Sequence, residues 1–217
     1  MSAKKILMIG WEYPPHHSGG LGVACKGMAH ALVDNDVHVC FMLPKTLTLE
    51  EKRVTIAFAD KRVTKQSNPI PLPPHLEIAA RELSNPYITS VEYEKKLRAF
   101  IALGGDPMLA RGRVMPGTLF EKVEYYGALI QTLSKNDLED FDLIHAHDWL
   151  CFPAGLAAKK LTNKPLIVHI HATEFDRCGG SNVNQYVYDK EREGMHAADH
   201  IIAVSDLTKR TIVDKYG

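Results

Sequence analysis

The sequence has few cysteines, and they are scattered. Four of its 217 residues are cysteine, and no two of them form a CxxC pair. This pattern excludes a disulfide framework and a zinc site built from paired cysteines. We therefore expect a reduced, cytoplasmic chain stabilised by its apolar core, for which its length is sufficient.

The sequence also lacks an excess of either charge and any long apolar run. Its 26 basic residues balance its 26 acidic residues, so the formal net charge is zero. Such a chain has no general electrostatic attraction for nucleic acid or anionic membranes. The apolar run after the two N-terminal lysines is too short for a signal peptide or a membrane-spanning helix. We expect neither a nucleic-acid partner nor an integral membrane segment.

Short apolar runs alternate with helical patterns along most of the chain. The runs are KILMIG, VHVCFML, VTIAFA, FDLIHAHD, PLIVHIHA and HIIAVS. Unbroken apolar runs are typical of strands buried on both faces. Between them we expect helices at about residues 22–35, 118–134, 151–161, 185–198 and 206–216. This alternation predicts an α/β fold with a doubly wound, mostly parallel, Rossmann-like sheet.

The stretch from about residue 60 to 116 departs from this alternation. It holds most of the prolines, including NPIPLPPH, and one helical segment, SVEYEKKLRAF. A structureless insert of this length is uncommon in a compact domain. We therefore expect an excursion, a hairpin plus a helix, at one end of the sheet of a single domain.

A glycine-rich loop, WEYPPHHSGGLG, separates the first expected strand from the first helix. Free N–H groups at a helix start, together with the helix dipole, attract an anion, and glycine lets a ligand approach closely. The alternative is that Gly19 and Gly20 only form the turn. A dinucleotide GxGxxG site is excluded because Cys25 occupies its sixth position, strand two ends without an acidic residue, and eight residues separate Gly10 from Gly19.

Polar side chains follow three later strands, where ligands gather in a doubly wound sheet. They are His145, His147, Asp148 and Trp149, then His171, Thr173, Glu174, Asp176 and Arg177, and finally Ser205 and Thr208. Together with the glycine loop, four strand ends should therefore meet at one edge of the sheet.

Each of these residues also has a purely structural interpretation. His145 and His169 lie inside strands, which favours core or hydrogen-bonded histidines. Asp148 and Ser205 are each suited to capping the helix that follows. Asp176 and Arg177 are suited to a local ion pair.

A zinc site from the four histidines of the two HxH pairs is a further alternative. Imidazoles from neighbouring strands can meet, but no carboxylate and no third ligand spacing supports such a site. We therefore expect no metal and no other cofactor.

Four motifs in order, GGLG, HAHDW, HATEFDR and VSDLTK, resemble the N-terminal half of retaining GT-B glycosyltransferases. The resemblance is to the glycogen and starch synthase-like enzymes and their sucrose-phosphate-synthase-type relatives, and it covers nearly the whole chain outside the excursion. It implies transfer of a sugar from a nucleotide-diphosphate sugar to a glycan or other hydroxyl acceptor. It also implies retention, no metal and no covalent enzyme intermediate.

The resemblance assigns roles to individual residues. His171 would contact the transferred sugar and support positive charge at its anomeric carbon, as the catalytic residue. The donor diphosphate would lie on the glycine loop, at Gly19, Gly20 and Gly22. The residues on the acceptor side and in the cleft would be His17, His147, Asp148, Trp149, Thr173, Glu174, Asp176, Arg177 and Ser205.

Two departures qualify the resemblance. Glycogen synthases have lysine in KxGGL where this chain has His17, which puts a specific ADP-glucose assignment in doubt. The glutamate pair of the family's donor-binding domain is absent, so we expect a single acceptor-side domain over residues 1–217. The chain alone should then be inactive without its C-terminal domain.

A non-catalytic glycan-binding module and a GT-B epimerase or phosphorylase relative remain alternatives.

Overall fold

The computed structural model is an α/β domain centred on a parallel sheet. It describes residues 3–16, 19–60, 73, 75–76, 78–79, 90–105, 118–138 and 140–217. Within these ranges six strands pair in the order β3-β2-β1-β4-β5-β6, and every neighbouring pair is parallel. The strands are β1 (Lys5–Ile9), β2 (His38–Leu43), β3 (Thr55–Phe58), β4 (Leu143–His147), β5 (Leu166–Ile170) and β6 (His200–Ala203). All six apolar runs are confirmed as strands.

Helices connect the strands, as the alternation predicts. Those formed by the described residues are α1 (Gly20–Asp34), α4 (Ser90–Ala102), α6 (Leu119–Gln131), α7 (Lys135–Leu138), α8 (Phe152–Thr162), α9 (Glu174–Arg177), α10 (Gln185–Ala197) and α11 (Asp206–Tyr216). The five helices expected between the strands are confirmed, and α4 confirms the helix expected within the excursion. The expected hairpin falls outside the described residues.

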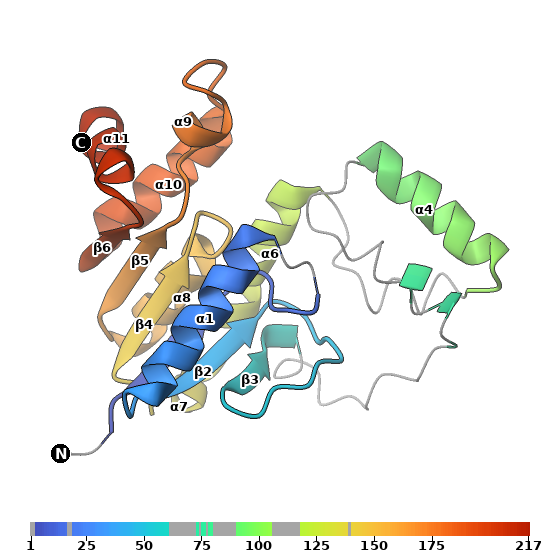
Figure 1. Ribbon diagram of the computed structural model, residues 1–217, viewed down its shortest axis with the longest axis horizontal. Helices are drawn as coiled ribbons and strands as arrows, with labels where there is room; N and C mark the ends of the chain where they lie inside the picture. Colours follow the sequence, from blue (N-terminus) through green and yellow to red (C-terminus); the bar gives the residue numbers. More distant parts are fainter. Residues whose placement is uncertain are drawn as a thin grey trace.

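Helices cover both faces of the sheet (Figure 1), and each face has its own apolar cluster. On one face, Cys25 and Ala29 of α1 pack with Met8 and Phe41 of the strands beneath. On the other face, α6 and α8 pack against the strand residues that alternate with these. Burial on both faces explains why the strands are continuously apolar. None of the helices in the described part of the chain is long and apolar enough to span a membrane.

The strand order defines where a ligand would bind. From β1 the chain proceeds outward to β2 and β3, and then returns to place β4 on the opposite side of β1. Loops that leave neighbouring strands in opposite directions open a crevice at their carboxyl ends. The glycine loop follows β1, and the HDW segment follows β4, so both line this switch point.

Candidate functional site

Helix α1 begins at the glycine loop, and an acidic residue of that loop folds back onto its first turn. The Oε1 atom of Glu12 accepts a hydrogen bond from the backbone N–H of Gly22 at 2.8 Å, and the carboxylate also bonds the N–H of Gly19. Burial raises the pKa of Glu12, although both hydrogen bonds favour its charged form. Glu12 therefore satisfies two of the free amides at the helix start from within the chain.

The glycines of the loop consequently differ in what they face. A Cβ on Gly22 would lie 3.0 Å from Cγ of Glu12, so the absence of a side chain there makes room for the carboxylate. A Cβ on Gly20 would meet nothing within 4 Å. Gly20, the first residue of α1, is therefore the glycine of this turn that is open to an incoming anion.

Asp148 stands at the end of β4 in a left-handed backbone conformation, with φ of 58°. Its N–H donates to the carbonyl of His169 at 2.9 Å, and its Oδ1 accepts the N–H of His171 at 2.7 Å. Burial raises the pKa of Asp148 to about 7, while hydrogen bonds from the His171 and Ala172 amides oppose the rise. The N-cap of α8 is Cys151, so the capping interpretation of Asp148 is wrong. Asp148 instead fixes the backbone that carries His171.

His171 follows β5 and contacts the fully buried His147 at the end of β4. The Nδ1 atom of His147 lies 3.1 Å from Nε2 of His171, within hydrogen-bonding distance. Burial, with a smaller contribution from His169, lowers the pKa of His171 to about 4. The imidazole of His171 is therefore neutral at neutral pH. Its contact with His147 orients the ring.

Four imidazoles form a cluster on the α1 face of the sheet, made of His145, His147, His169 and His171. Neighbouring ring centroids lie 4.3 to 5.5 Å apart. His145 and His169 are each 5% exposed, which confirms that they belong to the core. Burial lowers the pKa of His145 to about 3, to which the neighbouring imidazoles contribute.

The segment after β5 holds its own polar residues in local bonds. Thr173 caps α9 in a reciprocal capping box with Asp176. Arg177 pairs with Glu174 and the buried Glu191, and donates to the carbonyl of Ala172 at 2.7 Å. The alternative interpretation of Asp176 and Arg177 as a local ion pair is therefore wrong. These contacts fix the conformation of the segment that follows His171.

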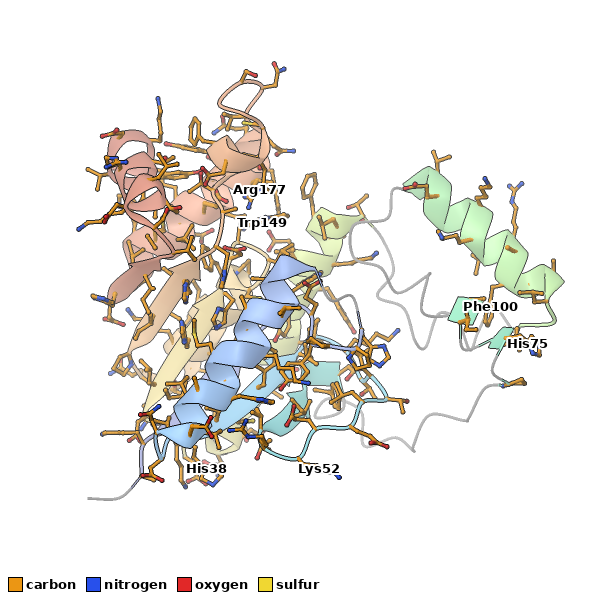
Figure 2. All side chains as sticks on the ribbon, viewed as in Figure 1. His38, Lys52, His75, Phe100, Trp149 and Arg177 are labelled. Carbon is orange, nitrogen blue, oxygen red and sulfur yellow. The ribbon has the colours of Figure 1, made fainter. Side chains whose placement is uncertain are left out.

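The remaining candidates are more peripheral. The Trp149 ring packs against Phe120 and Tyr186, with centroids 6.1 and 6.3 Å away, so it belongs to the core beside the site. Trp149 and Arg177 lie at the same edge of the sheet in Figure 2. Ser205 accepts the N–H of Thr208 at 3.1 Å, which confirms it as the cap of α11. His17 falls outside the described residues.

Sequence reasoning missed two residues of this site. Glu12 is the acidic residue in the glycine loop, a signal that could have been noticed, but its hydrogen bond to Gly22 depends on the folded loop. Cys25 lies in the second turn of α1, and its sulfur lies within 4.8 Å of ring nitrogens of His147 and His171. This contact places α1 directly against the histidine cluster.

Fold and site together define a doubly wound α/β domain with a ligand crevice between β1 and β4. A family model described as the starch synthase catalytic domain matches residues 5–217. The chain belongs to this family, and the resemblance to glycogen and starch synthase-like GT-B glycosyltransferases is confirmed.

Individual relatives agree with this assignment. The chain is 28% identical over 197 residues to an uncharacterized glycosyltransferase of Methanocaldococcus jannaschii, covering 91% of this chain and 37% of that protein. It is 24% identical to the glycogen synthase of Mycobacterium tuberculosis, covering 98% of this chain and 45% of that protein. The chain thus spans less than half the length of these relatives.

A solved structure shows the same fold. Sucrose-phosphate synthase from Thermosynechococcus elongatus superposes with a TM-score of 0.56 at 14% sequence identity. The match covers 99% of this chain and 45% of that structure. The likeness supports the GT-B type of Rossmann-like domain.

Proposed function

We propose that this chain is the N-terminal, acceptor-side domain of a retaining glycosyltransferase. The enzyme moves a sugar from a nucleotide-diphosphate sugar to a glycan or other hydroxyl acceptor. The observation that carries the proposal is the packing of α1, whose first residue Gly20 is open, against the histidine cluster, where the sulfur of Cys25 lies within 4.8 Å of ring nitrogens of His147 and the neutral His171. The scattered cysteines support a reducing, cytoplasmic setting.

The chemistry follows from the charges that develop during transfer. As the bond to the leaving diphosphate breaks, positive charge grows at the anomeric carbon. A neutral imidazole at His171 can support that charge, whereas an imidazolium would repel it. Negative charge on the diphosphate is met by the N–H of Gly20 and the dipole of α1. No metal and no covalent enzyme intermediate takes part in this proposal.

A second domain would supply the remaining contacts to the donor. The chain covers 37% and 45% of its relatives, which leaves room in proteins of that kind for such a domain. We therefore place the donor-binding glutamates outside these 217 residues, and expect this chain alone to turn over little substrate.

Donor screening on the full-length protein tests the function. ADP-, UDP- and GDP-sugars are supplied with glycan acceptors, and release of nucleotide diphosphate is measured with formation of a longer glycan. Coupled release and elongation support the proposal. Glycan binding without release of nucleotide diphosphate would indicate a binding module. Transfer of a glycan's sugar to inorganic phosphate would indicate a phosphorylase.

Gly20→Val in the full-length enzyme is expected to raise the donor KM about 10- to 100-fold, because a branched side chain would displace a charged hydrogen-bond partner. Gly27→Val is the matched control, since it lies on the same helix and its Cβ also meets nothing within 4 Å. Steady-state kinetics and a melting curve are recorded for both variants. Equal donor KM values for the two variants would contradict binding of the donor diphosphate at Gly20.

A further inference from the structure

We propose that His145, His147 and His169 form a binding site for a divalent transition-metal ion such as Zn²⁺. The site lies beneath α1 and is separate from the transfer reaction. The ion would join β4 to β5 directly below the loop that carries His171.

The strand register brings these three imidazoles together. Residues two apart on a strand share a face, so His145 and His147 point to the same side of the sheet. His169 is the pairing partner of His147 across the β4–β5 ladder. One ring nitrogen from each of the three histidines lies within 4.8 Å of the others. The sequence shows two HxH pairs, and the strand register shows which three of their four histidines lie together as possible ligands.

The same histidines carry polar atoms without partners. Among the described residues, Nε2 of His145, Nε2 of His147 and Nδ1 of His169 are buried and make no hydrogen bond. All three side chains are at least nine-tenths buried. Unsatisfied buried nitrogens are costly and rare, and an ion is one of the recognised explanations for them. A single ion would satisfy all three atoms at once if it bonded each ring through its unpartnered nitrogen.

The contact between His147 and His171 favours the same arrangement. If Nδ1–H of His147 donates to Nε2 of His171 across their 3.1 Å separation, the lone pair of His147 lies on Nε2. That atom is the one without a partner. Metal-bound histidines commonly donate their other N–H to a neighbouring group that orients the ring. His171 would take this orienting role and would not itself be a ligand.

The ligand set indicates the kind of ion. Three imidazole nitrogens suit zinc, copper or nickel rather than magnesium or calcium, which prefer oxygen. Bonds of about 2.0–2.1 Å would draw the three nitrogens to about 3.3 Å from one another, so small ring rotations accompany binding. A competing centre at Cys25, His147 and His171 would place a thiolate on the metal and break the His147–His171 contact.

Zinc content and Co²⁺ spectra of this chain test the proposal. The purified protein is stripped with chelator under mild denaturation, refolded with Zn²⁺, and dialysed against metal-free buffer. We expect about one zinc per chain and a higher thermal midpoint than that of the stripped protein. Co²⁺ should give visible absorption without a thiolate charge-transfer band.

Variants separate the two centres. His169→Gln should weaken Zn²⁺ binding more than about 100-fold, exceeding the loss expected for an outer partner. Cys25→Ser and the exposed His38→Gln should bind as the parent does. A parent chain that retains no zinc and shows no midpoint shift overturns the proposal whatever the variants do. A thiolate band, or loss of binding in Cys25→Ser, overturns the three-histidine assignment.

Discussion

Replacing His171 by alanine is expected to lower kcat of the full-length enzyme about 100-fold and to change the donor KM much less. In the proposed function His171 contacts the sugar more strongly as positive charge develops, so removing it should raise the free energy of the transition state more than that of the bound substrate. One well-placed electrostatic contact contributes about 3 kcal/mol. Steady-state kinetics with a donor that the enzyme turns over measure the effect.

The control must separate chemistry from folding, because His171 is also packed against His147. A melting curve is recorded on the same preparation, and kcat is expressed per folded molecule. The exposed His38→Ala serves as the matched variant, since His38 lies at the opposite edge of the sheet (Figure 2). A destabilised His171→Ala enzyme with normal kcat per folded molecule would remove His171 from the catalytic role.

Metal-free protein is expected to lose unfolding free energy as the pH is lowered from 7 to 4.5. Burial lowers the pKa of His145 to about 3 and that of His171 to about 4. It also lowers the pKa values of His147 and His169. In this window the unfolded chain binds protons that the folded chain does not. Stability is therefore full above about pH 6.5 and falls as the pH falls.

Three acids among the described residues act in the opposite direction. Burial raises the pKa of Asp148 to about 7 and also raises those of Glu12 and Glu191. An acid whose pKa is higher in the folded state than in the unfolded state makes the fold more stable as the pH falls. Burial raises the pKa of Cys25 as well, so that thiol does not titrate in this window. Four imidazoles whose pKa values are lowered stand against three acids whose pKa values are raised, so we expect a net loss of stability on acidification.

Urea unfolding at several pH values, with chelator present, measures this dependence. The midpoint should decline as the pH is lowered from about 6.5 toward 4.5. A midpoint that stays level or rises on acidification would contradict the burial of neutral imidazoles in one cluster.

The strands and long helices could be predicted because their signals are local. An apolar run of five or six residues, followed by a helical pattern, identifies an α/β unit wherever it occurs. Helix α9 was missed because its four residues, Glu174–Arg177, depend on a capping box rather than on a periodic pattern. Short helices of this kind have no period to detect.

The site could be predicted in outline but not in its bonds. Strand ends meet at one edge of any parallel sheet, so the closeness of Asp148, His171 and the glycine loop follows from topology. The fold of the loop determines that Glu12 bonds Gly22, and pairing across β4 and β5 determines that His147 faces His169. Both contacts depend on the tertiary structure, so the local sequence does not predict them.

The anomeric configuration of the product tests the central claim most directly. The full-length protein is supplied with the nucleotide sugar that screening identifies and with its acceptor, and the new glycosidic bond is followed by NMR from the first turnovers. The proposal predicts transfer with the anomeric configuration of the donor sugar retained. An inverted bond, or glycan binding with no transfer from any nucleotide sugar, would contradict it.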